Sequence, residues 1–379
     1  MKILTITTYL GYNYGASLQA YALQTYLKKQ GHDSQVIRLE FEYLMRYYAF
    51  WYVNPDSKLS RNFFTRMIYR IAKWGQRRTT LKRKAVFDFF NHKVLDETNV
   101  FKKREQLYNN PPKADMYLCG SDQIWNVLYE AGQDPIFYLD FVKKGKKASY
   151  AASFSYLDLP CDHYERICHS LKSFDGISVR EYQGKELLDK MGLESTWVLD
   201  PVFLLTLEDW DSLIERKDIL RYENDEPGDE KYLLVYDFEL GNDGLKAFAL
   251  DYATRHELKI YAIVDRFPLS YAEKNFKNAG PVDFVRLIKG CNAFVSNSFH
   301  GTVFSMLYHK PFYVFNRRLH KVNSRMESLL KAFNLEDTLM DSEDKIMNSE
   351  KVIFDWEYVE KLKAEQLDVS VDYLRKLGV

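Results

Sequence analysis

The fold is decided first by residues 2–31, KILTITTYLGYNYGASLQAYALQTYLKKQG. Residues 2–9 are apolar and β-branched, which predicts a buried strand. A loop with two glycines follows at residues 11–15, and apolar side chains then recur at helical spacing until Gly31. Residues 34–39 have the composition of a second strand. The chain therefore opens as a β–α–β unit, which predicts a parallel sheet.

The same alternation of strands and helices returns in two series along the chain. Further strands are expected at 115–120, 147–154, 176–180 and 196–199, and then at 231–236, 258–264, 293–297 and 311–315. We therefore predict an α/β protein with two Rossmann-like domains that face a central cleft. The expected divisions are a first domain at 1–205 with a helical insert at about 40–110, a second domain at 206–350, and a C-terminal helix within 351–379 that packs back on the first domain. Ligands of such sheets bind beyond the carboxyl ends of the strands.

Composition excludes several classes of protein. The 379 residues carry 53 Lys and Arg against 53 Asp and Glu, so there is no overall positive field for nucleic acid. The four cysteines form no Cys-x-x-Cys pair, which argues against a zinc site and favours reduced thiols of the cytoplasm. The N-terminal apolar segment is too short and too β-branched for a signal peptide, and no apolar run reaches the length of a membrane span. We expect a cytoplasmic protein without a metal.

Two polar loops follow predicted strands in the first half. Asn13, Tyr14 and Gly15 precede the first helix, whose free N–H groups suit an anion, although a tight turn is the alternative. After the strand near residue 119, the side chains are of kinds that hold sugar hydroxyls: Ser121, Asp122, Gln123, Trp125 and Asn126. The alternative for this second loop is a helix cap with Trp125 in the core.

Two further strand ends carry groups that suit charge binding and proton transfer. Arg180 stands where a strand meets a helix and could hold a carboxylate or phosphate with two hydrogen bonds, although an ion pair with an acid is the more common role. Asn297, Ser298, His300 and Gly301 gather at a strand end in the second half. An imidazole there can act as an acid or a base near neutral pH, and a structural histidine is the alternative.

These segments resemble, in this order, those of the polysaccharide pyruvyl transferases, over about residues 1–335. Residues 150–154, YAASF, and 198–201, VLDP, belong to the same set of motifs. The resemblance implies a fold similar to the GT-B glycosyltransferases. It also implies transfer of pyruvate, as a ketal, from phosphoenolpyruvate to a sugar of a cell-surface polysaccharide, with no cofactor beyond that donor. The acceptor would be a glycan or a lipid-linked sugar. Within that activity His300 is the candidate for proton transfer, and Arg180 and Arg325 are candidates for holding the anions.

The chain departs from the family pattern at one position. Many members carry an arginine two residues before the histidine of the fourth motif, where this chain has Ser298. Two alternatives therefore stay open. They are a GT-B-like glycosyltransferase that uses a nucleotide sugar and a non-catalytic protein of a glycan pathway.

A basic run lies inside the expected helical insert. Residues 61–84 contain nine Lys and Arg and no acid. Such a cluster predicts either a solvated helix face or an interface between subunits, or else peripheral contact with the inner face of a membrane.

Overall fold

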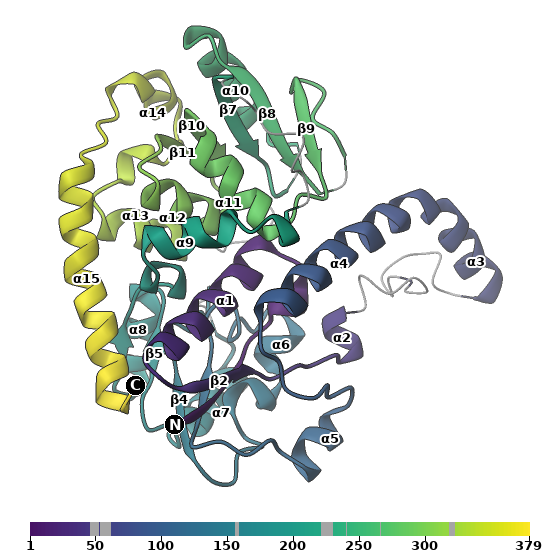
Figure 1. Ribbon diagram of the computed structural model, residues 1–379, viewed down its shortest axis with the longest axis vertical. Helices are drawn as coiled ribbons and strands as arrows, with labels where there is room; N and C mark the ends of the chain where they lie inside the picture. The colour runs from purple at the N-terminus through teal and green to yellow at the C-terminus, as the bar shows by residue number, and fades with distance from the viewer. Residues whose placement is uncertain are drawn as a thin grey trace.

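Two parallel sheets organise the computed structural model, which describes residues 1–45, 53, 62–155, 159–220, 230–239, 241–265, 267–317 and 323–379 (Figure 1). The first sheet has the order β2-β1-β3-β4, with the strands β1 (Lys2–Ile6), β2 (Asp33–Val36), β3 (Met116–Cys119) and β4 (Lys146–Ser149). Isolated bridges continue it toward the short pair β5 (Ser178–Val179) and β6 (Thr196–Trp197). The prediction of an α/β fold with parallel pairing is confirmed.

The second sheet has the order β11-β10-β7-β8-β9. Its strands are β7 (Tyr232–Tyr236), β8 (Lys259–Val264), β9 (Lys274–Lys277), β10 (Ala293–Ser296) and β11 (Phe312–Val314). Every residue of β7 is buried, because helices cover both faces of the sheet. Leu233 and Val235 pack against α10 (Asp243–Arg255), whereas Leu234 and Tyr236 share a core with α11 (Pro281–Gly290) and α12 (Phe299–Leu307).

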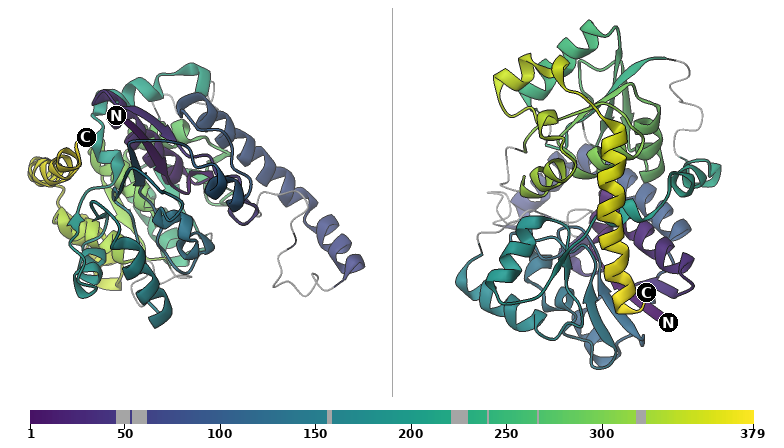
Figure 2. Two further views of the ribbon diagram at one scale, coloured as in Figure 1. Left: turned by 90° about the horizontal axis from the view of Figure 1, so that it is seen from below. Right: turned by 90° about the vertical axis from the view of Figure 1, so that its left-hand side faces the viewer.

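The C-terminal helix α15 (Trp356–Leu377) returns to the first sheet. Its residues Tyr373, Leu374 and Leu377 share a core with Ile3 of β1 and Leu23 of α1 (Tyr14–Lys29). The Tyr373 hydroxyl donates to the backbone oxygen of Ser149 at 2.7 Å. Figure 2 shows this helix running past both halves of the molecule. The boundaries near residues 205 and 350 stay predictions.

Part of the expected helical insert forms an arm. Its helices are α2 (Glu42–Met45), α3 (Phe63–Ala72) and α4 (Trp74–Val94), and the insert residues 46–52 and 54–61 lie outside the described residues. The C-terminal part of α4 packs into the core through Phe87 and Phe90. Its first half and α3 project away from the body (Figures 1 and 2).

The remaining helices flank the two sheets. They are α5 (Arg104–Asn109), α6 (Glu130–Gln133), α7 (Cys161–Leu171), α8 (Tyr182–Lys190), α9 (Leu207–Ile214), α13 (Ser324–Ala332) and α14 (Glu343–Met347). Within the described ranges, none of the helices combines the length and the apolar character that crossing a bilayer requires.

Candidate active site

A cavity of about 410 Å³ lies between the two halves of the molecule. The first half contains the sheet β2-β1-β3-β4, and the second half contains the sheet β11-β10-β7-β8-β9. Asn13 follows β1, Asp122 follows β3 and Asn297 follows β10, so the carboxyl ends of strands from both sheets meet at it. Arg317 and Arg325 add two cations from the second half. This is the position at which ligands bind to doubly wound sheets.

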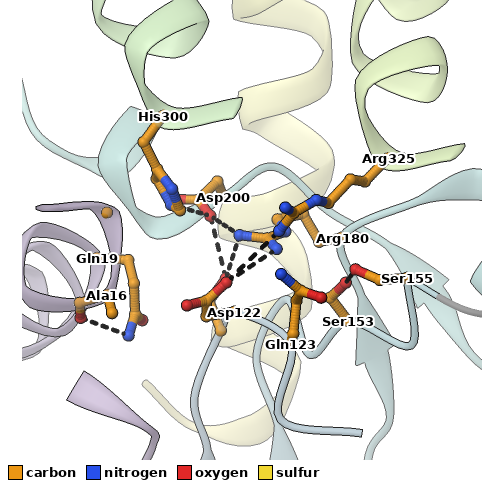
Figure 3. A network of polar contacts seen from close by, with 12 residues as sticks. Ala16, Gln19, Asp122, Gln123, Ser153, Ser155, Arg180, Asp200, His300 and Arg325 are labelled. Atoms are coloured by element: carbon orange, nitrogen blue, oxygen red, sulfur yellow. Dashed lines mark hydrogen bonds and ion pairs between the residues drawn. The ribbon is translucent and has the colours of Figure 1, made fainter. Parts of the chain in front are cut away.

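The polar network beneath the cavity centres on Asp200. Its Oδ2 lies 2.7 Å from Arg180 Nη1 and 3.3 Å from His300 Nε2, and it accepts a hydrogen bond of 3.1 Å from Ser121 Oγ. Its Oδ1 accepts from the backbone N–H of Val202 at 3.1 Å, which fixes the carboxylate at the start of a short 3₁₀ turn. One carboxylate oxygen therefore joins a cation of the first half to the imidazole of the second (Figure 3).

The charge of Asp200 is stabilised although its side chain is fully buried. Burial by itself would raise the pKa of this carboxyl, but His300 and then Arg180 outweigh it, so that the pKa lies well below its usual range. The carboxylate stays ionised at neutral pH. It can therefore orient the imidazole of His300, whose Nε2 lies 3.3 Å away.

His300 reaches this position because of two local features. Ser298 caps α12, accepting from the backbone N–H of Gly301, and this places His300 in the first turn of the helix. The imidazole then lies directly against Gly15 of α1. A Cβ at Gly15 would stand 1.8 Å from His300 Nδ1 and 2.2 Å from its Cγ. Gly15 is thus required for the close approach of the two halves and not only for a turn.

Arg325, on α13, supplies the cation nearest to this network. Its Nη1 lies 3.6 Å from Asp122 Oδ1, and its guanidinium lies over the ring of Phe299. With the Gln123 amide turned so that its oxygen faces Arg325, that oxygen accepts from both Nη atoms at 3.1 Å. Burial, and then the positive charge of Arg180, lower the pKa of Arg325 to about 10. A bound anion would relieve this excess of positive potential.

Arg317 is the second cation of the cavity wall. Its Nε lies 3.2 Å from Glu239 Oε1, and its guanidinium lies over the ring of Phe238. The side chain is 11% exposed, so it keeps access to the cavity that Arg180, at 1%, does not have.

Arg180 therefore differs from its expected role. Its guanidinium is committed to Asp200 and, at 3.4 Å, to Asp122, and it is stacked on Phe299. It does not line the cavity. Ser121 is likewise fully buried and contacts Asp200 rather than the cavity. Both residues lie beneath the cavity, and Arg180 forms the ion pairs with nearby acids that were the alternative to anion binding.

Four other expected binding residues belong to packing. The Trp125 Nε1 donates to the backbone oxygen of Phe137 at 2.9 Å, and its ring is fully buried. Asn126 is also buried and holds its own turn by accepting from the N–H of Leu128. Tyr14 stacks on a phenylalanine of α11, and Gly301 has no room for a Cβ beside Phe294.

The cavity lining retains the rest of the expected set. These residues are Asn13, Asp122, Gln123, Asn297, Ser298, His300 and Arg325, with Gly15 against His300. Sequence reasoning missed the roles of Asp200 and Arg317. Asp200 had a signal in the VLDP motif, where an acid follows a strand and precedes a proline. Among the residues that the structure describes, no three His, Cys, Asp or Glu side chains gather as metal ligands.

Comparison with known proteins adds a family and a fold. The profile of a family described as polysaccharide pyruvyl transferase matches residues 13–318. No curated protein matches the chain. Among solved structures, UDP-GlcNAc 2-epimerase from Neisseria meningitidis, bound to UDP-GlcNAc, has 15% identity and a TM-score of 0.52, covering 99% of this chain and 100% of its own.

Two further solved structures extend this comparison. A second UDP-N-acetylglucosamine 2-epimerase has 12% identity and a TM-score of 0.52, covering 99% of this chain and 94% of its own. The glycosyltransferase SnogD from Streptomyces nogalater has 12% identity and a TM-score of 0.42, covering 100% of this chain and 99% of its own. Identities this low show the fold alone, and the expected similarity to the GT-B fold is confirmed.

Proposed function

This chain belongs to the polysaccharide pyruvyl transferase family, and we propose that it transfers the pyruvyl group of phosphoenolpyruvate, as a ketal, to a sugar of a cell-surface polysaccharide. The observation that carries the proposal is the cavity between the two halves, which Arg325, Arg317 and His300 all line. Phosphoenolpyruvate is a small molecule with two anionic groups, and an arginine can bind each of them with two hydrogen bonds.

The proposed chemistry needs one proton transfer to carbon. A proton adds to C3 of the donor while a sugar hydroxyl oxygen bonds to C2 and loses its own proton. The bond from C2 to the phosphate oxygen then breaks, and phosphate leaves with the electron pair. A second hydroxyl of the sugar bonds to C2, loses its proton, and closes the ketal. No oxidation or reduction occurs, and phosphate is the only other product.

His300 is the proposed proton carrier in these steps. Its Nε2 lies 3.3 Å from the ionised Asp200, which positions the ring at the cavity where the acceptor hydroxyl would give up its proton. The neutral side chains of Gln123 and Asn297 line the same cavity and suit the hydroxyl groups of a sugar. The acceptor would be a glycan or a lipid-linked sugar.

Ser298 stands where many family members carry an arginine, and this difference favours a second candidate function, a glycosyltransferase that uses a nucleotide sugar. Ser298 is short, caps α12 and lines the cavity where many family members carry an arginine. Of the residues that the structure describes, Arg317 and Arg325 are the arginines that line this cavity. A nucleoside diphosphate also carries two anionic groups, so the two arginines suit either donor. A measurement of which donor binds is therefore needed to distinguish the two candidate functions.

Thermal unfolding with phosphoenolpyruvate and with a panel of UDP-sugars makes this separation. We expect stabilisation by phosphoenolpyruvate alone. Arg325→Ala should weaken that binding by about 10- to 100-fold, since a charged hydrogen bond contributes about 1.5–3 kcal/mol. Lys331→Ala, an exposed cation on the same helix α13, is the matched control.

Mass spectrometry of the surface polysaccharide from a deletion strain tests the product. Loss of a pyruvate ketal is expected. Stabilisation by a UDP-sugar and not by phosphoenolpyruvate, with the ketal retained in the deletion strain, would overturn the proposal.

A further inference from the structure

Helix α3 carries an apolar face that points away from the protein core. Phe63, Phe64, Met67, Ile68 and Ile71 are 68%, 78%, 51%, 57% and 66% exposed. Their spacing places them on one side of a helix, because residues three and four apart lie on the same face. Trp74, at the start of α4, is 53% exposed and extends the same apolar surface. A contiguous exposed patch of this kind marks an interaction site.

Cations border this face. Arg66, Arg70 and Lys73 recur at spacings of four and three residues on another side of the helix. Arg78 follows in α4, and residues 61–84 contain no acid. Arg61, the first cation of this run, lies outside the described residues. Aromatic and aliphatic side chains on one face, with lysine and arginine beside them, are typical of a helix that lies in a membrane interface.

The arm is firmly attached to the body. Arg83 of α4 donates to the backbone oxygen of Tyr12 at 3.2 Å and forms an ion pair of 2.6 Å with Asp265. Phe87 and Phe90, one and two turns further along, are buried in the core. These contacts fix the later part of α4, from which α3 projects, to the body.

We propose that α3 and the start of α4 bind the surface of an anionic lipid bilayer. The helix lies parallel to the surface, with its apolar side chains in the boundary between headgroups and acyl chains. Arg66, Arg70 and Lys73 contact the anionic headgroups. The inference concerns a surface outside the cavity and does not depend on the reaction proposed above.

Two observations favour a bilayer over a second copy of the chain. A symmetric contact between two α3 helices would bring their cations together, and like charges repel. The arm is also linked to the site, because Tyr43 and Leu44 of α2, the helix before α3 in the chain, line the cavity. Attachment through α3 would hold the cavity near a membrane surface.

Co-sedimentation of the full chain with vesicles tests the proposal. The vesicles are phosphatidylcholine alone or mixed with phosphatidylglycerol, across a salt series. We expect binding to the mixed vesicles only, weakening as salt rises. Arg66→Gln/Lys73→Gln should bind about 30-fold more weakly at low salt, because each cation near an anionic surface contributes about 1 kcal/mol. Lys143→Gln/Lys144→Gln, exposed elsewhere, is the control and should bind as the wild type does.

The apolar contribution needs its own variant. Phe64→Ser/Ile68→Ser should lower binding at least about 100-fold, since each buried apolar side chain contributes about 1.5–3 kcal/mol. Met347→Ser/Ile353→Ser removes two side chains that are 74% and 83% exposed elsewhere, and should leave binding unchanged. Circular dichroism should show that all variants are folded, because these side chains lie outside the core.

Two results would overturn the proposal. One is the absence of binding to phosphatidylglycerol vesicles at low salt. The other is unchanged binding by Phe64→Ser/Ile68→Ser. If the wild type is instead a dimer by light scattering and this variant is a monomer, with no vesicle binding by either, the face is an interface between copies of the chain.

Discussion

Replacing Gly15 with alanine would place a methyl group inside the imidazole of His300. The new Cβ would stand 1.8 Å from Nδ1, whereas an ordinary contact begins at 3.4 Å, so one of the two must move by about 3.4 − 1.8 = 1.6 Å. The nearest atoms include Cγ at 2.2 Å, which is the root of the ring, so rotation of the ring cannot relieve the overlap. His300 Nε2 would then leave its position 3.3 Å from Asp200. A displacement of about 1 Å in a catalytic geometry lowers the rate about 100-fold, or by ~2.7 kcal/mol in the barrier.

The Gly15→Ala variant should also lose stability, by up to about 2 kcal/mol net, which is less than the ~2.7 kcal/mol expected for the barrier. Alanine is the better helix former by up to about 1 kcal/mol, whereas an extra methyl group in a packed site costs about 1–3 kcal/mol. Gly75 offers a matched control. It is the second residue of α4, as Gly15 is the second residue of α1, and a Cβ there would have nothing within 4 Å. Gly75→Ala should retain full activity.

Phosphate release from phosphoenolpyruvate in the presence of the acceptor glycan measures the effect. A crystal structure of Gly15→Ala should show the His300–Asp200 distance increased. Activity within twofold of Gly75→Ala, together with an unchanged distance, would refute the reasoning, because His300 would then not need the space that Gly15 provides.

Two further predictions concern groups beneath the cavity. Asp200→Asn should destabilise the protein by about 3–5 kcal/mol at pH 7, because it leaves Arg180 and His300 without their shared carboxylate. Folding lowers the pKa of Asp200, so the stability that its carboxylate contributes is fully present above the unfolded pKa of about 3.9. That contribution is lost as the pH falls through the folded pKa. Urea unfolding should therefore show a smaller stability difference between the wild type and Asp200→Asn below pH 4. Trp125→Phe should lower stability by about 1–3 kcal/mol through loss of the hydrogen bond to Phe137 and leave the KM for phosphoenolpyruvate unchanged. A raised KM with unchanged thermal unfolding would restore Trp125 to the binding site.

Much of the fold could be predicted because its strands are buried on both faces and so read as apolar runs. The strands expected at 231–236 and 258–264 correspond closely to β7 and β8. The strand β9 was not predicted, since its sequence, Lys274-Asn275-Phe276-Lys277, has one buried apolar residue at the edge of the sheet. The helix expected at 301–309 begins earlier, at Phe299, because the Ser298 side chain caps it.

The site was only partly predictable, because charge and position on a strand end do not say what a side chain faces. Both Arg180 and Arg325 were expected to hold anions, yet Arg180 is enclosed by Asp200 and Asp122 whereas Arg325 lines the cavity. The difference arises from packing between segments far apart in the chain. The same holds for Trp125, whose partners in the core lie beyond its own loop.

The first helix explains why the two halves meet so closely. Tyr14 stacks on Phe284 of the second half, with 4.4 Å between the ring centroids, and the Tyr14 hydroxyl accepts a hydrogen bond from Arg83 of the arm. One residue later, Gly15 lies against His300. Tyr14 thus fixes α1 against the second half, and the missing side chain at Gly15 lets the imidazole come within reach of Asp200. Because Asp200 belongs to the first half and His300 to the second, the pair exists only while this contact is closed. Any side chain at Gly15 would hold the halves apart at the point where proton transfer is proposed.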